Sequence, residues 1–154
     1  MSRNRRQALG VTALRHTGIV VTDLARSLGF YRDLLGLKPW RTMTESGPYI
    51  DTVVGLRGAR IKWVKLKAPG GGLVELLQYL SHPRSAPKQR RSNDVGASHV
   101  AFTVPNVSAL CMEITRCGLR VNNLPILSPD GRTKVAYAHD PDGTIIELVE
   151  MVAK

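Results

Sequence analysis

Cysteines, aromatic residues and long apolar segments are scarce or absent in this sequence. Two of its 154 residues are cysteines and 5% are aromatic. Cys111 and Cys117 lack metal-finger spacing, so we expect two reduced thiols. No apolar stretch approaches the roughly 18 residues of a membrane-spanning helix, and no signal-peptide core follows the basic N-terminus. The cytoplasm is therefore the expected compartment, and a membrane is not an expected partner.

Acidic residues are also few, 12 against 22 basic ones, which gives a net charge of +10. A basic chain can bind nucleic acid. Because no stacking motif lies among its charges, nucleic acid is the less favoured partner. We expect a small anionic metabolite instead, such as a carboxylate or a phosphate-bearing thioester. Much of the positive excess lies in two segments with little predicted structure, a tail and a central linker: Arg3, Arg5, Arg6, Arg84, Lys88, Arg90 and Arg91.

A short pattern occurs twice, and in each copy a histidine on one predicted strand is followed much later by a glutamate on another. The first copy contains His16 and Glu75, and the second contains His99 and Glu147. A residue typical of a helix cap lies seven residues after the histidine in each copy. It is Asp23 in the first copy and Asn106 in the second. Proline- and glycine-containing turns precede both glutamate strands. The repeat therefore covers whole modules rather than isolated residues.

Each module is predicted to have the order β-α-β-β-β. Strands are predicted from β-branched and alternating residues, and helices from apolar residues at three- and four-residue steps. Residues 44–58 contain Gly and Pro breakers and are expected to be irregular. The expected organisation is a flexible basic arm at 1–12, a first module at 13–80, a linker at 81–96 and a second module at 97–151. The predicted strands are 14–21, 37–42, 60–66, 73–80, 98–104, 119–121, 134–138 and 144–149, and the predicted helices are 23–35 and 107–117.

The repeated histidines and glutamates have the chemistry of a divalent-metal site. Side chains alternate between the two faces of a strand, and each of the four shares its face with apolar or small neighbours. An unpaired buried carboxylate is costly, so each glutamate needs compensation. A divalent cation supplies it, with two neutral imidazoles completing the ligand set. The alternative is that Arg15, Lys62 or Lys65 pairs with the acids.

These motifs resemble the vicinal oxygen chelate superfamily, which includes glyoxalase I, methylmalonyl-CoA epimerase, extradiol dioxygenases and fosfomycin-resistance proteins. The resemblance implies an α+β, glyoxalase-like fold in which two βαβββ modules form a curved mixed sheet around a metal site. It also implies a homodimer, and some members build each site across two chains. By this resemblance His16, Glu75, His99 and Glu147 hold one divalent ion: nickel, cobalt, zinc, manganese or magnesium. The resemblance covers about residues 13–151 and rests on segments 16–24, 30–37, 74–77, 98–102 and 140–148.

Four protein ligands on a six-coordinate metal leave two positions for neighbouring substrate oxygens. The metal can then stabilise the enolate formed when the adjacent carbon loses a proton. This chemistry suits a glyoxalase I-type lyase or a methylmalonyl-CoA epimerase-type isomerase that acts on a thioester or a glutathione adduct. By resemblance, Glu147 or Glu75 is the catalytic base. Glu45 lies roughly where the epimerases carry a catalytic glutamate, and Tyr49 and Arg41 are candidate substrate contacts.

Two alternatives remain at this point. A ring-cleaving dioxygenase of the same superfamily usually holds iron through two histidines and one carboxylate, and the extra acid Glu75 argues against that role. A small-molecule binding or resistance protein of the same fold has no need for four ligands. Metal analysis of the purified protein would separate this second alternative from an enzyme.

Overall fold

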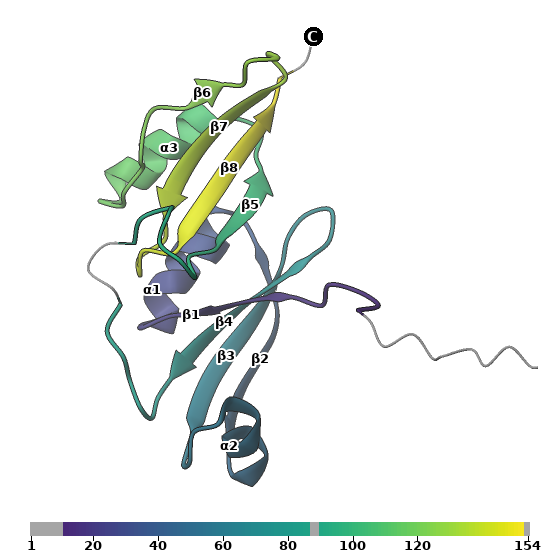
Figure 1. The fold of residues 1–154 in the computed structure, drawn as a ribbon, viewed down its shortest axis with the longest axis vertical. Coiled ribbons are helices and arrows are strands. Elements are labelled where there is room, and N and C mark those ends of the chain that lie inside the picture. The colour runs from purple at the N-terminus through teal and green to yellow at the C-terminus, as the bar shows by residue number, and fades with distance from the viewer. Residues whose placement is uncertain (1–10, 87–89, 153–154) are drawn as a thin grey trace, which may run out of the picture.

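The computed structural model describes residues 11–86 and 90–152, which fold into two modules, each with a four-stranded sheet (Figure 1). The predicted α+β fold of two related modules is confirmed. In the first module the elements are β1 (Thr17–Val20), α1 (Leu24–Leu28), the π-helical segment η1 (Gly29–Leu34), β2 (Lys38–Ser46), α2 (Pro48–Val54), β3 (Arg60–Lys67) and β4 (Leu73–Tyr79). In the second they are β5 (His99–Thr103), α3 (Val107–Arg116), β6 (Ile126–Leu127), β7 (Thr133–His139) and β8 (Ile145–Met151).

The two sheets have the same strand order and the same register. The order is β1-β4-β3-β2 in the first sheet and β5-β8-β7-β6 in the second. In each sheet the first strand pairs in parallel with the last strand of its module, and the other pairs are antiparallel. Glu75 lies opposite Gly18, and Glu147 lies opposite Ala101, so each glutamate faces the residue two positions after its histidine. Equivalent positions of the sequence repeat, including the glutamates, therefore occupy equivalent positions in the two sheets.

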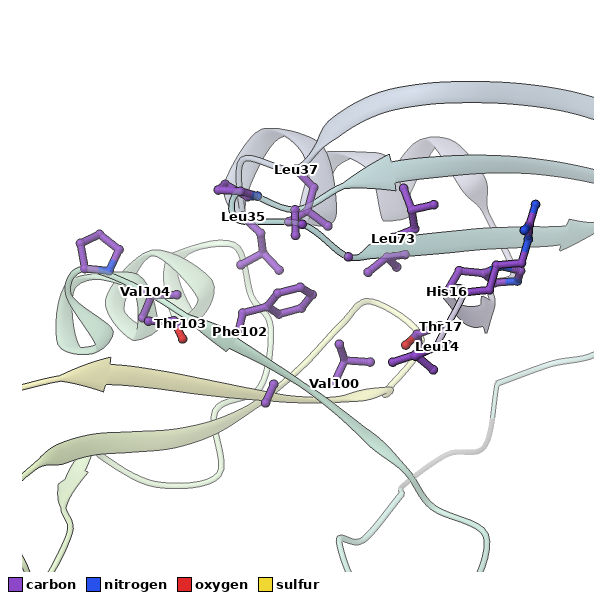
Figure 2. A pocket seen from close by; sticks show the side chains of 18 residues that line it. Leu14, His16, Thr17, Leu35, Leu37, Leu73, Val100, Phe102, Thr103 and Val104 are labelled. Atoms are coloured by element: carbon purple, nitrogen blue, oxygen red, sulfur yellow. The ribbon is translucent and has the colours of Figure 1, made fainter. Parts of the chain in front are cut away.

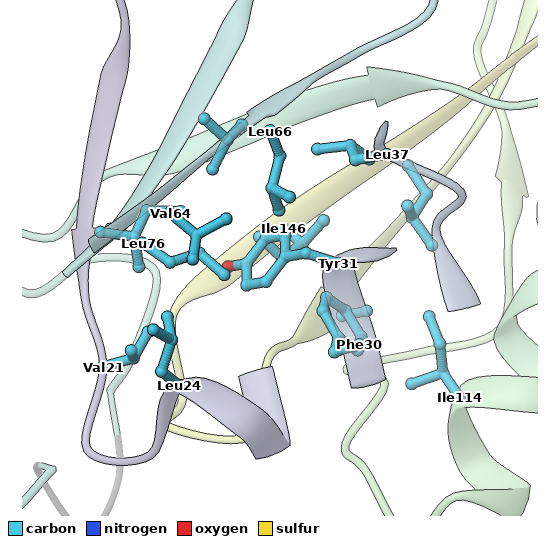
Figure 3. Packing of buried hydrophobic residues seen from close by; sticks show 14 of the residues in the cluster. Val21, Leu24, Phe30, Tyr31, Leu37, Val64, Leu66, Leu76, Ile114 and Ile146 are labelled. Carbon is cyan, nitrogen blue, oxygen red and sulfur yellow. The ribbon is translucent and has the colours of Figure 1, made fainter. Parts of the chain in front are cut away.

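One face of each sheet packs into a hydrophobic core that the two modules share. Tyr31, which is fully buried, lies in this core with side chains from both sheets and from α3 (Figure 3). Burial of apolar area at roughly 25 cal/mol per Å² is the dominant stabilising contribution of such a core. The buried members from the first module include Val21, Leu24, Phe30, Leu66 and Leu76, and those from the second include Ile114, Ala136, Ile146 and Leu148.

The opposite face of the first sheet carries a second, smaller cluster. Ile50 of α2 packs there with Ile61 and Trp63 of β3. Strand parity puts Glu75 on this same face, because Trp63 lies opposite Leu77 and Lys65 opposite Glu75. Helix α2 therefore covers one end of the face, and the charged residues lie toward the other end.

Equivalent side chains begin α1 and α3. The carboxylate of Asp23 accepts a hydrogen bond from Arg26 N at 3.0 Å, which caps α1. Asn106 caps α3 in the same way. The first backbone N–H of each helix also donates to a side chain of the glutamate strand. Leu24 N donates to Gln78, and Val107 N donates to Glu150. The side chain three residues after each repeated glutamate thus fixes the helix that follows each histidine strand.

The turn before each glutamate strand has the same backbone hydrogen bonds but different side chains. In the first module Gly71 N donates to Ala68 O, and in the second Gly143 N donates to Asp140 O. The second turn carries two carboxylates that bind the first module. Tyr31 donates to Asp140, and the backbone N–H of Thr22 donates to Asp142 at 2.8 Å. The Asp140–Gly143 turn therefore ties the modules together.

Several predicted element boundaries were wrong. The strand expected at 37–42 continues to Ser46, and the 44–58 segment expected to be irregular contains α2, which begins at Pro48 and ends at Gly55 in the left-handed conformation. Residues 119–121 form a single bridge at Val121 rather than a strand, and the next strand is β6, in a segment predicted as a loop. The predicted first helix changes to a π-helical segment at Gly29.

The first ten residues of the predicted arm and residues 87–89 of the predicted linker lie outside the described residues. Residues 81–86 and 90–98 contain neither helix nor strand, as expected for a linker. Over the described ranges, no helix has the length and apolar character needed to cross a membrane.

Candidate metal centre

The first histidine–glutamate pair lies at the β1 edge of the first sheet. His16 comes directly before β1, and Glu75 lies on the neighbouring β4. The distance between His16 Nε2 and Glu75 Oε2 is 3.0 Å, and the side chains are 28% and 11% exposed. The other ring nitrogen of His16, Nδ1, is buried without a hydrogen-bond partner. Nε2 is thus the nitrogen that this histidine presents beside the carboxylate.

The second pair repeats this geometry in the second sheet. His99 Nε2 lies 3.0 Å from Glu147 Oε2, and the side chains are 46% and 22% exposed. Tyr137, the strand neighbour of Glu147, lies against the imidazole with a ring–ring distance of 5.4 Å. The second pair is more open to solvent than the first.

Within one chain the four predicted ligands form two separate pairs. Over the described ranges, no group of three or more His, Cys, Asp or Glu side chains is close enough to hold a metal ion. The pairs belong to different sheets, β1–β4 and β5–β8. Each module therefore holds one pair of the four predicted ligands.

The geometry of each pair suits two ligands of one metal ion. Ligand bonds of about 2.1 Å at right angles place the two donor atoms roughly 3.0 Å apart. Both pairs have this separation, and both offer an imidazole nitrogen with a carboxylate oxygen. A mixed set of two imidazoles and two carboxylates binds the divalent ions of the first transition row. These residues thus fit a divalent cation.

Lys65 makes the two halves chemically different. Its Nζ lies 3.2 Å from Glu75 Oε1, the oxygen that does not contact His16, and its side chain is 17% exposed. The same ammonium lies 4.9 Å from the centre of the Trp63 ring. The sequence offered Lys65 as an alternative partner for the acids, and this ion pair is present. It uses Oε1, whereas Oε2 is the oxygen beside His16. The equivalent position in the second module is Tyr137, which the repeat offset could have identified.

Glu45, predicted in a loop, lies on β2 opposite Ile61. Its Oε2 accepts a hydrogen bond from Trp63 Nε1 at 2.6 Å. Ile61 is four residues from Lys65 along β3, which is ~13 Å of strand. Glu45 nevertheless shares the sheet face of Glu75, and its carboxylate is held by Trp63, whose ring also contacts Lys65.

The two predicted substrate contacts lie in different surroundings. Arg41 pairs with Lys65 across β2 and β3, and its guanidinium lies 5.9 Å from the centre of the Trp63 ring. It therefore shares a sheet face with Glu75. Tyr49 lies on α2 and is 74% exposed. The structure thus places Arg41 on the sheet face of the His16–Glu75 pair and Tyr49 on the surface of α2.

A cavity of about 510 Å³ lies between the two modules, next to His16 (Figure 2). Its walls are mainly apolar, and Phe102 of β5 points toward Leu35 and Leu37. Glu75, His99 and Glu147 do not line it. The cavity is therefore separate from the paired carboxylates.

Several shifted pKa values occur around the turn that joins the modules. Burial raises the pKa of Asp140 and, together with the charge of Asp140, holds the pKa of Tyr31 well above its usual range. Burial lowers the pKa of His139, whose ring nitrogens lie 3.2 Å from Gly143 O and 2.8 Å from Asn122 Oδ1. These groups hold the turn in place and lie outside the two His–Glu pairs.

Comparison with known proteins identifies the family of this chain. The model of the Glyoxalase/Bleomycin resistance protein/Dioxygenase superfamily matches residues 13–148. A Synechocystis sp. protein described as a probable lactoylglutathione lyase is 32% identical over 92% of this chain and 97% of its own length. The lactoylglutathione lyase of Salmonella typhimurium is 30% identical over 89% and 91%. The solved structure of a glyoxalase family protein from Bacillus cereus has a TM-score of 0.84 at 21% identity, covering 99% of this chain and 100% of that one, and supports the fold alone.

Proposed function

Because the chain belongs to the Glyoxalase/Bleomycin resistance protein/Dioxygenase superfamily, we propose that it is a divalent-metal-dependent lyase of the glyoxalase I type. Its substrate would be a glutathione adduct or a related thiol adduct with two neighbouring oxygens. The observation that carries this proposal is the pair of equivalent His–Glu contacts, both 3.0 Å long. Relatives at 30–32% identity that are named lactoylglutathione lyases favour lyase over epimerase chemistry.

We further propose that each metal site forms between two chains. His16 and Glu75 of one protomer would join His99 and Glu147 of its partner, so that a symmetric dimer contains two sites. This assembly explains why one chain holds its ligands as separate pairs over the described residues. It also explains why the half-exposed His99 stands on a sheet face without a covering helix in its own module, since α3 packs on the other face.

A divalent ion bound by these residues would polarise the substrate carbonyl and stabilise the negative charge that develops when the neighbouring C–H bond loses its proton. The chain's own contribution is the base. Glu147 contacts only His99 among the described ion pairs and is 22% exposed, whereas Glu75 is held by both His16 and Lys65. The less restrained Glu147 is therefore the better candidate to accept the proton and return it to the adjacent carbon.

Metal analysis of protein purified without chelators tests the first part of the proposal. We expect close to one bound divalent ion per chain, and a marked loss of metal in the Glu75→Gln and Glu147→Gln variants. Glu113→Gln, at an exposed position on α3, is the matched control. A screen for proton–deuterium exchange on hemithioacetals and thioesters then separates lyase from epimerase chemistry. If the wild-type chain binds no divalent ion, a metal-free binding protein, in which Lys65 alone neutralises Glu75, replaces this proposal.

Subunit complementation tests the assembly across two chains. One variant combines His16→Ala with Glu75→Gln, and the other combines His99→Ala with Glu147→Gln. Each alone should bind no metal. After unfolding and refolding as an equimolar mixture, half of the dimers are mixed and each has one intact site, so about a quarter of the wild-type metal binding should return. A site within one chain predicts no recovery on mixing.

A further inference from the structure

Lys65 is an unusual neighbour for a metal ligand, because it places a second cation beside the same carboxylate. Its Nζ contacts Glu75 Oε1, and its side chain is largely shielded from solvent. The ring of Trp63 lies 4.9 Å from it and adds a cation–π contact. The lysine is therefore held in place on two sides.

The charge balance of the assembled site gives this lysine a consequence. One divalent cation, two neutral imidazoles and two carboxylates sum to zero, so Lys65 leaves the site with one positive charge. A shielded positive charge stabilises an anion strongly, because the surrounding dielectric is low. An ammonium also has three N–H donors, and Glu75 is the only ion-pair partner of Lys65 within the described ranges. Donors thus remain for a ligand.

The internal repeat shows that this charge is not required by the fold. Lys65 lies opposite Glu75 in β3–β4, and Tyr137 lies opposite Glu147 in β7–β8. The second module therefore builds the same His–Glu pair without a lysine. The positive charge belongs to one side of the site, and a ligand that uses it must lie in one orientation.

We propose that Lys65 binds an anionic oxygen of the substrate next to the metal, so that the site selects small acids or adducts that carry a carboxylate beside the chelating oxygens. This inference rests on the proposed function, because it requires the metal site to form. Arg41, which pairs with Lys65 across the strands, extends the same positive surface.

Calorimetry on the nickel- or zinc-loaded protein tests the proposal with two probes of similar shape and different charge. Oxalate and oxamate both offer neighbouring oxygens, but oxalate carries one more negative charge. We expect Lys65→Met to weaken oxalate binding by about tenfold, the effect of one charge-assisted hydrogen bond, and to reduce the preference for oxalate over oxamate. Lys65→Arg should retain most of the oxalate affinity. Lys67→Met is the matched control, because Lys67 is exposed and lies over the Trp40 ring.

Metal affinity, measured by competition with a chelator, separates this role from a structural one. If Lys65 only held Glu75 in position, Lys65→Met would weaken metal and oxalate binding together. Our proposal predicts metal binding at least as tight as in the wild type, since a competing cation is removed, together with weaker oxalate binding. Equal oxalate affinity in Lys65→Met and wild type would overturn the role of Lys65 and leave the metal site intact. Absence of metal from the wild type would overturn the proposed function itself.

Discussion

The hydroxyl group of Tyr31 donates a hydrogen bond of 2.9 Å to Asp140 Oδ2. The two residues are 109 positions apart and belong to different modules, and both are buried. The other carboxylate oxygen of Asp140 accepts from the backbone N–H groups of Asp142 and Thr144. One side chain thus shapes its own turn and holds it against the π-helical segment of the first module.

Removing the Tyr31 hydroxyl should destabilise the protein as a whole. In Tyr31→Phe the buried Asp140 loses a donor, and the expected cost is about 1–3 kcal/mol in the free energy of unfolding. Urea unfolding followed by circular dichroism measures it. Tyr49→Phe removes the same atom from a residue that is 74% exposed and should change the stability little. Equal stability of Tyr31→Phe and wild type would contradict the role given to this bond.

The burial of Asp140 should appear as a specific pH dependence. Because burial raises its pKa in the folded state, the folded protein holds this proton to a higher pH than the unfolded chain. The contribution of Asp140 to stability is therefore present below about pH 4 and is lost as the pH rises through the raised folded-state pKa. Asp140→Asn has no such titration. The difference in unfolding free energy, wild type minus variant, should fall as the pH rises above about 4.

Taking this difference reduces the contribution of His139, whose lowered pKa acts in the opposite sense and which also responds to the charge of Asp140. Its stabilisation is lost as the pH falls below about 6.5, because the unfolded chain then binds the extra proton. Asp140→Ala serves as a second comparison, since it removes all three accepted hydrogen bonds. A flat difference between wild type and Asp140→Asn would show that burial does not shift this carboxyl.

Asp142 should be the main polar link between the second turn and α1. It accepts from the backbone and side chain of Thr22 and pairs with Arg26, and its side chain is 5% exposed. We expect Asp142→Ala to cost about 2 kcal/mol, because a buried acceptor of several bonds is lost. Amide hydrogen exchange at Thr22 should accelerate. Asp33→Ala is the control, since its ion pair with Arg32 is exposed and contributes little.

The two cysteines should differ in their reactivity. Cys117 is exposed, whereas Cys111 is buried on α3 and burial raises its pKa, so little thiolate is available for reaction. Titration of the folded protein with a thiol reagent should detect one thiol promptly and the second only after denaturation. Cys117→Ser should abolish the prompt reaction. Rapid labelling of Cys111 in that variant would show that α3 opens readily.

Much of the module plan could be read from the sequence, because its signals are local. The caps Asp23 and Asn106 and the glycine-rich turns fix where the helices and hairpins begin and end. Helix α2 was missed because Gly47 and Pro48 indicated a break, although proline in the first turn and glycine after the end are also typical of a short helix. Strand β2 was predicted too short because its last residues are mostly polar. They are extended because they pair with β3, which the local sequence does not indicate.

The candidate site was only partly predictable. Periodicity places His16 beside Glu75 and His99 beside Glu147, since partners on neighbouring strands share a face. In the proposed assembly, the gathering of both pairs into one centre depends on contact between chains, and a single sequence does not encode that relation in its local pattern. The contacts of Asp140 with the first module were also missed, because its partner Tyr31 is far away along the chain.

The cavity between the modules lies where the turn of the first module lacks the side-chain contacts that the Asp140–Gly143 turn makes. It lies between the Ala68–Gly72 turn and Pro105. In the repeat, Pro105 is equivalent to Thr22, which the Asp140–Gly143 turn contacts directly. Gly70 stands where the second turn has Asp142. A protein built from two first modules would therefore have two such cavities and no polar link between its modules. One built from two second modules would have two such links. The duplicated halves are no longer interchangeable, and a graft of the second turn into the first is a rational route to a more stable molecule.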